Sequence, residues 1–480
     1  MRSHDTIKIL IIGAGKAGEL ISSEILSEPQ SGYEIIGFID DNVGKSVNGI
    51  EVLGGISDIR NIVRTELIEE ILIALPSERG KVIRDIIEQT IDLKIVYKIL
   101  PRLSEVLLQD FNESYLQYVR RVKPEDMLGG EILKTDQEDI SNFSLPQTIL
   151  ITGAAGSIGS ELSRQVAAHG ARKVVFYDWW ENGIFDLRNQ LLETNPNGDY
   201  EFIIGDVKDE RRVEEVMSMY RPTTIFHAAA YKHVPLMEYN ATEAVKNNIL
   251  GTKTVAEAAV KYGVSKFILI STDKAVNPTN IMGATKRTAE KIIHILANSQ
   301  NKTTFCAVRF GNVINSNGSA IPFFEKQIEK GGPVTVTHRE ITRYFMTIPE
   351  AVHLILQTWV MGENDDLFVL DMGESIKIYD LARALIAMRG YIPDEEIKIN
   401  ITGLRPGEKL YEEVLVKEEE TKATTFKKIF RTTNYMNFDK VKFNEDLNDL
   451  IIFAKTNTLD SEQIKKRLQA IVETYTPAVS

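Results

Sequence analysis

Thr272, Asp273 and Lys274 stand side by side directly after an apolar run, KFILIS. A carboxylic acid can donate a proton and a neutral amine can accept one, so adjacent Asp and Lys side chains could perform acid–base chemistry. The threonine hydroxyl can hydrogen-bond a substrate hydroxyl. The other interpretation of an Asp–Lys dipeptide is an exposed ion pair. The stretch NIMGATK, which follows at 280–286, favours acid–base chemistry instead.

The stretch NIMGATK, residues 280–286, carries Lys286 with Met282 four positions before it. A tyrosine in the earlier position marks one large group of nicotinamide enzymes, in which Tyr is the general base and Lys holds the nicotinamide ribose. Lys286 can still hold a ribose, whereas methionine cannot transfer a proton. The chain is therefore either an inactive relative of these enzymes or one whose proton transfer has moved to Asp273 and Lys274.

A second group of residues could hold a dinucleotide. The stretch TGAAGSIGSE places three glycines at G-x-x-G-x-x-G spacing between an apolar strand and a helix expected to begin near Ser157. Glycines let the backbone approach a pyrophosphate, and the N–H groups of a helix N-terminus attract that anion. The contacts predicted in this loop come from Gly153, Ala155, Gly156, Ser157, Ile158 and Gly159.

The carboxylate expected to bind the adenosine ribose is Asp178, which ends the strand KVVFYD 19 residues after Gly159. A carboxylate there accepts hydrogen bonds from the ribose hydroxyls and repels a 2′-phosphate, so the predicted cofactor is NAD rather than NADP. Further cofactor contacts are predicted after the next two strands, from Asp206, Val207, Ala228, Ala229, Ala230 and Lys232.

The elements that position these residues are recognisable as apolar runs. Helical stretches separate six of them: TILITG, KVVFYD, EFIIGD, TTIFHAAA, KFILIST and TFCAVRFGN. This alternation predicts an α/β fold with a doubly wound parallel sheet, whose ligands bind at the carboxyl ends of the strands. After about residue 315 the alternation gives way to a mixed region that we expect to bind substrate.

The first segment predicts another Rossmann-like unit. Its opening strand meets Gly13, Gly15 and Gly18 at G-x-G-x-x-G spacing, and the next strand ends in Asp40 and Asp41. A tight strand–helix turn without a ligand explains this loop as well as a dinucleotide site does, because no catalytic group follows it.

The domain organisation follows from these two units. We expect an N-terminal Rossmann-like domain over 1–110, a polar linker over 111–146 and a second α/β domain over 147–480. Within the second domain, the cofactor-binding core spans about 147–315 and the interleaved substrate-binding portion about 316–480, which includes a helical tail at 440–475.

The composition predicts a globular cytoplasmic protein. The chain has 480 residues, of which 43% are hydrophobic and 26% charged, enough for two or three domains. Cys306 is the single cysteine and the seven histidines are scattered, so neither an internal disulfide nor a metal site is predicted. The sequence shows no secretory signal and no apolar run of about 18 residues that would predict a membrane helix. A net charge of −12 argues against a nucleic-acid partner.

Seven stretches, in order, resemble the extended short-chain dehydrogenases of bacterial polysaccharide biosynthesis: TGAAGSIGSE, HAAAYKHVPLME, NNILGT, STDKAVNPTNIMGATKR, RFGNV, GPVTVTHREITRYFMTIPEA and LRPGEKLYEE. Within that group the chain is most similar to the UDP-N-acetylglucosamine 4,6-dehydratases that carry Met at the Tyr position. The resemblance covers nearly the whole chain, including the first Rossmann-like unit. Family members often carry four transmembrane helices before that unit, and this sequence has none.

The resemblance implies an NAD-dependent 4,6-dehydration of UDP-N-acetylglucosamine, with hydride passing from C4 to NAD, water lost across C5 and C6, and hydride returned to C6. For that reaction we assign Lys274 as the C5 base, Asp273 as the acid that protonates the leaving C6 oxygen, and Thr272 as the partner of the C4 hydroxyl. The acceptor of the C4 hydroxyl proton stays open between Asp273, Lys274 and a relay through Thr272. Likeness to the Met-bearing group implies retention of configuration at C5.

Substrate contacts are expected from the region after the sixth strand. Arginine suits a diphosphate because its planar fork donates two hydrogen bonds, and a glutamate can accept from a uridine ribose hydroxyl. The candidates are Asn312, Ser316, Ser319, Arg343, Arg405 and Glu408. The alternative for Arg343 is an ordinary surface charge. A homo-oligomer, a dimer or larger, is also expected.

Two other functions fit parts of the sequence. A UDP-sugar 4-epimerase would use the same scaffold, although such enzymes rely on the missing tyrosine and need no acid–base pair for C5 and C6. A catalytically silent regulator that binds NAD or a nucleotide sugar would explain Met282 as a lesion.

Among the neighbouring residues, Asn248 is expected to order the backbone near the site. Trp179 and Trp180 would cover the adenine or pack at an interface.

Overall fold

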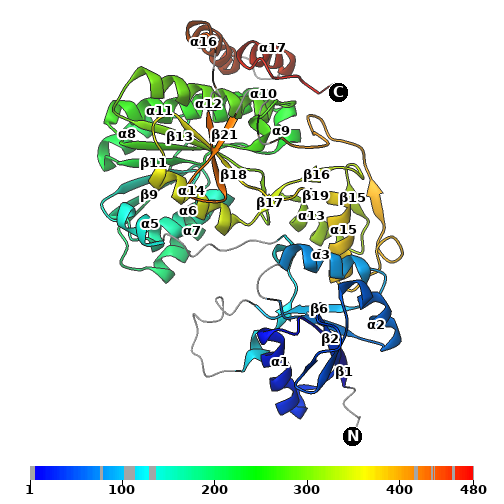
Figure 1. Ribbon diagram of the computed structural model, residues 1–480. Coiled ribbons are helices and arrows are strands. Elements are labelled where there is room, and N and C mark those ends of the chain that lie inside the picture. Colours follow the sequence, from blue (N-terminus) through cyan, green and yellow to red (C-terminus); the bar gives the residue numbers. More distant parts are fainter. Residues whose placement is uncertain are drawn as a thin grey trace. The chain divides into compact units, whose positions relative to one another are not determined.

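The computed structural model describes residues 6–75, 79–101, 114–128, 137–413, 415, 420–433, 436, 438–456 and 460–478 (Figure 1). The chain packs as two compact units, each assembled from separate parts of the sequence. The first unit consists of residues 1–131, 318–340 and 377–402, and the second of residues 132–317, 341–376 and 403–480. The domain boundaries expected at 110 and 146 stay predictions, and within the linker between them residues 111–113 and 129–136 lie outside the described residues.

The first unit is built on a seven-stranded sheet with the order β3-β4-β2-β1-β5-β6-β7. The central strands run parallel, and the edge strands β3 and β7 are antiparallel to their neighbours. This arrangement agrees with the Rossmann-like unit predicted for the first segment. Its elements are β1 (Ile7–Ile12), α1 (Lys16–Ser27), β2 (Tyr33–Ile39), β3 (Ser46–Val47), β4 (Ile50–Gly54), α2 (Ile59–Thr65), β5 (Glu70–Ile73), α3 (Arg79–Gln89), β6 (Val96–Ile99) and β7 (Arg120–Arg121).

Two later segments of the chain belong to this first unit. They contribute α13 (Ala320–Glu329), β15 (Val334–Val336), α15 (Ile378–Met388) and β20 (Ile399–Ile401). Strands β15 and β20 pair in parallel. Helix α15 contacts α3, where Arg383 Nη1 lies 2.7 Å from Glu88 Oε1. Part of the region expected to bind substrate therefore packs with the N-terminal sheet.

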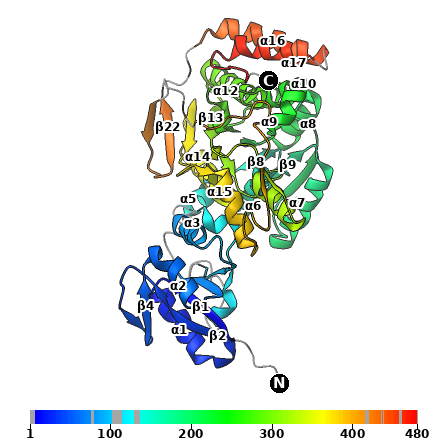
Figure 2. The ribbon, with the colours of Figure 1, turned by 90° about the vertical axis from the view of Figure 1, so that its right-hand side faces the viewer.

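The second unit contains the predicted doubly wound sheet (Figures 1 and 2). The strand order is β10-β9-β8-β11-β12-β13-β18-β22-β21. The six predicted strands hold adjacent positions, with the third strand at the edge and the first in the middle, as in a dinucleotide-binding sheet. The strands are β8 (Thr148–Thr152), β9 (Lys173–Asp178), β10 (Tyr200–Ile204), β11 (Thr224–His227), β12 (Lys266–Ile270), β13 (Thr304–Arg309), β18 (Asp366–Leu370), β21 (Glu420–Ala423) and β22 (Ile429–Thr433).

Helices cover both faces of this sheet, so its strands are apolar on both sides. In β8, Ile149 and Ile151 pack with one group of helices while Leu150 packs with the other, as the twofold alternation of a strand requires. The first group is α6 (Ser157–Ala168), α7 (Glu181–Thr194) and α14 (Ile348–Met361). The second is α8 (Glu210–Tyr220), α11 (Gly251–Tyr262) and α12 (Ile281–Ser299).

The helical tail predicted over 440–475 forms α16 (Lys440–Thr456) and α17 (Ser461–Ile471). These helices pack against α10 (Ala241–Ala244), α12 and the π-helical turn η5 (Val245–Leu250), and Figure 2 shows them in red beside α10 and α12. After α17 the backbone N–H of Thr476 donates to Pro278 O at 3.1 Å. Among the helices that the structure describes, none is long and apolar enough to cross a membrane.

Candidate active site

The glycine loop after β8 is shaped by close backbone packing. Gly153 has φ +69°, in the left-handed region, and a Cβ there would lie 2.5 Å from the backbone N of Ala229. A Cβ on Gly159 would clash with the carbonyl oxygen of Gly153. Helix α6 begins at Ser157, directly after this turn. The loop therefore brings backbone N–H groups close to the strand ends, where an anionic group can approach.

Asp178 lies at the end of β9 and is buried. Its carboxylate accepts hydrogen bonds from the backbone N–H groups of Ala155 at 3.0 Å and Trp180 at 3.0 Å. Burial raises the pKa of Asp178, against the effect of these hydrogen bonds. The predicted ribose carboxylate thus also orders the glycine loop, which ties the two parts of the predicted cofactor site together.

The other predicted cofactor residues lie at neighbouring strand ends. Asp206 is partly exposed and pairs with Lys208, whose Nζ lies 3.1 Å from Oδ2. Val207 is buried. The alanines at 228–230 follow β11 and are half-buried, while Lys232 is exposed. Trp179 and Trp180, which were expected to cover the adenine or to pack at an interface, keep exposed side chains, at 61% and 41%.

Asn248 orders the backbone beside this site, as expected. Its Oδ1 accepts from Tyr231 N at 2.8 Å, and its Nδ2 donates to Tyr231 O at 3.0 Å and Thr285 Oγ1 at 3.0 Å. The residue sits in the π-helical turn η5, a distortion often found near functional sites. One amide side chain therefore links η5, the segment after β11, and α12.

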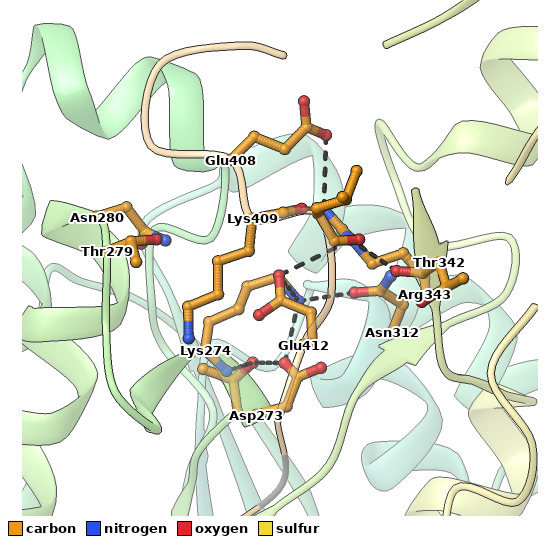
Figure 3. Close-up of polar contacts among 12 residues, drawn as sticks. Asp273, Lys274, Thr279, Asn280, Asn312, Thr342, Arg343, Glu408, Lys409 and Glu412 are labelled. Carbon is orange, nitrogen blue, oxygen red and sulfur yellow. Dashed lines mark hydrogen bonds and ion pairs between the residues drawn. The ribbon is translucent and has the colours of Figure 1, made fainter. Parts of the chain in front are cut away.

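The tripeptide after β12 forms a buried polar centre (Figure 3). Asp273 is 1% exposed, and its Oδ1 accepts from Lys274 Nζ at 3.0 Å and Thr272 Oγ1 at 2.9 Å. Lys274 Nζ also donates to Asn312 Oδ1 at 2.9 Å. Asp273 Oδ2 is buried without a hydrogen-bond partner among the described residues. The interpretation of Asp273–Lys274 as an exposed ion pair is therefore wrong.

Lys286 and Met282 lie on α12, next to this centre in the fold. Lys286 is buried and its Nζ donates to the carbonyl oxygen of Ile270 at 2.6 Å, at the end of β12. Burial lowers the pKa of Lys286 to about 8. Met282 is buried in the apolar cluster that α12 shares with α16 and α17. The ammonium group is at the strand end, and the methionine contributes packing.

A second buried cluster of charged residues contacts the end of the same strand, β12, through Ser271, and this cluster was not predicted. Ser271 Oγ donates to Glu290 Oε1 at 2.6 Å, and Arg309 binds both carboxylate oxygens of Glu290, at 2.8 and 2.7 Å. Burial raises the pKa of Glu290, but the charge and hydrogen bonds of Arg309 outweigh it and hold the pKa at about 2. The sequence gives no direct signal for this cluster, because its members lie on three elements.

Arg343 is buried, so its interpretation as an ordinary surface charge is wrong. Its guanidinium donates to the carbonyl oxygens of Thr342 at 2.7 Å and Lys409 at 2.8 Å, as Figure 3 illustrates. These bonds attach the loop at 403–413 to β16 (Thr342–Arg343). The same loop is tied to the start of α12, since Asn280 Nδ2 donates to Gly407 O at 3.1 Å.

The remaining predicted substrate residues differ in environment. Arg405 is 59% exposed in its side chain and pairs with Glu408, with 3.0 Å between Nη2 and Oε1. Ser316 is buried, and its Oγ donates to Val313 O at 3.1 Å. Ser319 precedes α13 and belongs to the first unit. Of the six candidates, Asn312, Arg343 and Glu408 lie in the polar network of Figure 3.

Glu412 belongs to that network and was missed. Its side chain is 3% exposed, and its Oε1 lies 3.9 Å from Lys274 Nζ and 3.8 Å from Arg343 Nε. Burial raises its pKa, and the charge of Asp273 acts in the same direction. Nothing in LRPGEKLYEE distinguishes Glu412 from the exposed Glu413 beside it, because only the folded loop brings one of them to Lys274.

The first unit repeats the glycine-loop geometry. Gly13 has φ +104°, and Asp40 Oδ2 accepts from the backbone N–H of Ala14 at 2.8 Å. Despite partial burial, the hydrogen bonds from Ala14 and Asn42 lower the pKa of Asp40. The contact corresponds to that of Asp178 with Ala155. Asp41 is exposed.

Comparison with known proteins finds a matching family model for a part of each unit. Residues 149–434 match the model of a family described as "Polysaccharide biosynthesis protein", and residues 1–101 match one described as "CoA-binding domain". The capsular polysaccharide biosynthesis protein CapD of Staphylococcus aureus is 44% identical over 428 residues, covering 88% of this chain and 71% of CapD. The probable polysaccharide biosynthesis protein EpsC of Bacillus subtilis is 46% identical over 431 residues, covering 88% of this chain and 70% of EpsC.

A solved structure, Pen from Bacillus thuringiensis, is 33% identical to the chain. It superimposes with a TM-score of 0.55 over 62% of this chain and 90% of Pen. The chain therefore belongs to the polysaccharide biosynthesis protein family, within the extended short-chain dehydrogenases that its motifs resemble.

Proposed function

We propose that this protein is an NAD-dependent 4,6-dehydratase of UDP-N-acetylglucosamine that supplies a UDP-4-keto-6-deoxy sugar for glycan or polysaccharide synthesis. The observation that carries the proposal is the buried Asp273–Lys274 pair, which lies at the strand end while α12 has Met282 in place of a tyrosine base. Dehydration needs an acid and a base at adjacent carbons, whereas hydride transfer alone does not.

The glycine loop is the proposed cofactor site, and its shape fits a dinucleotide. Gly153 and Gly159 sit where a Cβ would strike backbone atoms, so the loop lies close against the strand ends. Helix α6 would face the pyrophosphate, Asp178 the adenosine ribose, and Lys286 the nicotinamide ribose. When bound, the oxidised nicotinamide accepts the C4 hydride of the sugar and later returns it to C6.

The proton steps fall to the strand-end residues. Once C4 is a ketone, the C5 hydrogen becomes acidic, and the neutral amine of Lys274 would remove it. Asp273 would donate a proton to the C6 oxygen, which leaves as water. Lys274 would then return its proton to C5 as C6 receives hydride. Thr272, held by its hydrogen bond to Asp273, would orient the C4 hydroxyl.

Substrate binding is proposed for the loop at 403–413 and its neighbours. Arg405 has an exposed guanidinium that could turn to a diphosphate. Glu408 could accept from the uridine ribose. Arg343 would act indirectly, because its hydrogen bonds hold the loop backbone. Asn312 would hold Lys274 towards the sugar.

Incubation of the purified protein with UDP-N-acetylglucosamine in deuterated water tests the proposal. The expected product has lost one water and carries one deuteron at C5, detected by mass spectrometry and NMR. Unchanged mass with inversion at C4 would instead identify a UDP-sugar 4-epimerase. Absence of any turnover, with NAD bound, would support the silent regulator.

Replacing Gly153 with alanine is expected to weaken NAD binding at least tenfold. Alanine pays about 1–2 kcal/mol for left-handed backbone, and its Cβ would lie 2.5 Å from Ala229 N, so the loop must move. Gly263→Ala is the matched control, because φ is +73° there and nothing lies within 4 Å of a Cβ. Calorimetric titration with NAD measures both variants. Equal affinity in the two would contradict the proposed cofactor site.

A further inference from the structure

Proton balance leaves one role in the proposed dehydration unfilled. The C4 hydroxyl releases a proton when C4 is oxidised, and the leaving C6 oxygen takes a proton from Asp273. The C5 proton is removed and restored by Lys274, so it cancels. After one turnover an acceptor has gained a proton and Asp273 has lost one. The enzyme resets only if that proton travels from the acceptor to Asp273.

Glu412 is a second buried carboxylate beside Lys274, in addition to Asp273. Its Oε2 has no hydrogen-bond partner among the described residues, and neither does Asp273 Oδ2. Lys274 Nζ lies between the two carboxylates, 3.0 Å from Asp273 Oδ1 and 3.9 Å from Glu412 Oε1. Figure 3 shows the lysine flanked by both side chains.

We propose that Glu412 accepts the C4 hydroxyl proton and that Lys274 relays it to Asp273. The proposal rests on the 4,6-dehydration proposed above. In the first step the C4 O–H bond breaks, an O–H bond forms on Glu412, and the C4 hydride leaves with its electron pair to oxidised NAD. In the resetting step the Glu412 proton passes to the Lys274 amine, and an ammonium proton passes to Asp273. Both carboxyl groups then have their starting protonation.

The surroundings of Glu412 suit a proton acceptor. Burial makes its carboxylate a stronger base by raising its pKa. The positive charges of Arg343 and Lys409 act in the opposite direction, and Lys274 adds to them only when its amine is protonated. A general base works best when its pKa is near the pH of the reaction. The burial of Glu412 therefore favours a carboxylate that accepts a proton.

A purely structural role explains the geometry less well. Lys274 is already held by Asp273 and Asn312 at 3.0 and 2.9 Å, whereas Glu412 lies 3.9 Å away. Arg343 is likewise held by backbone carbonyls at 2.7 and 2.8 Å. A carboxylate used only as a clamp would be expected within hydrogen-bond distance. The unpartnered Oε2 is explained if a substrate hydroxyl occupies it.

Glu412→Gln tests the proposal, because the amide keeps the shape and cannot take a proton. After rapid mixing of the NAD-loaded enzyme with UDP-N-acetylglucosamine, formation of reduced nicotinamide is followed by absorbance. We expect its rate to fall about 100-fold, with substrate affinity changed less than threefold. Deuterium incorporation at C5 should fall by the same factor, since it requires the 4-keto sugar. Glu257→Gln is the control, because it makes the same change at an exposed carboxylate of α11 outside the proposed site, and it should react at the wild-type rate.

Other outcomes separate the possibilities. If Glu412→Gln forms reduced nicotinamide at the wild-type rate but loses water slowly, Glu412 only positions Lys274 and the proposal is overturned. Glu412→Asp keeps an acceptor and should recover part of the rate, which also covers a glutamine variant that folds poorly. If the wild-type protein forms reduced nicotinamide but releases no water, the dehydratase function fails independently of Glu412.

Discussion

Replacing Lys274 with alanine is expected to lower the rate of dehydration by about 100- to 10,000-fold, the usual contribution of a general base. Lys274 Nζ lies in a buried network with Asp273 and Asn312. We therefore expect no base from the solvent to replace it at the C5 proton. Deuterium incorporation at C5, measured by NMR in deuterated water, should disappear with it. Binding of NAD should change little, because the glycine loop and Asp178 are untouched.

Two further variants decide whether Lys274 acts as a base or only as a charge. Lys274→Arg keeps a positive charge but cannot become neutral, so it should be as inactive as the alanine variant. Lys253→Ala removes a lysine whose partner is Glu257, on the outer face of α11, and should keep full activity. Persistent C5 exchange in Lys274→Ala would show that another group removes the proton.

The fold was largely predictable because its parallel strands are buried on both faces. Such strands are mostly apolar along their whole length, so runs such as TILIT and KFILI indicate both a β-strand and its central position in the sheet. Residues directly after such strands are then carried to one edge by the topology. That is why Asp178, Asp273 and the glycine loop could be identified as neighbours.

The rest of the site could not be predicted, because it depends on long-range folding without a periodic signal. Glu412 reaches Lys274 from a loop 138 residues later in the chain, and that loop is held by Arg343 and Asn280. Arg343 was expected to bind substrate, yet its donors are largely taken by backbone carbonyls. The recruitment of 318–340 and 377–402 into the first unit also leaves no local pattern in the sequence.

The second large effect is expected at Glu290. Replacing it with glutamine should lower the free energy of unfolding by about 3–5 kcal/mol, because it leaves a buried arginine without its charge partner. Arg309 is 0% exposed and binds Glu290 through two hydrogen bonds. Urea unfolding followed by fluorescence measures the change, with the buried Trp359 as a reporter in the same unit. Glu257→Gln, which breaks an exposed pair, should cost less than about 1 kcal/mol.

The pH dependence of this difference gives a separate test of its cause. Arg309 holds the pKa of Glu290 at about 2, against an ordinary value of 4.5. A depressed pKa stabilises the folded state above the unfolded value, and that contribution is lost as the pH falls through the folded value. The stability gap between wild type and Glu290→Gln should therefore be constant near neutral pH and shrink between pH 4.5 and about 2. A gap that stays constant down to pH 2 would mean that the glutamine disturbs packing rather than charge.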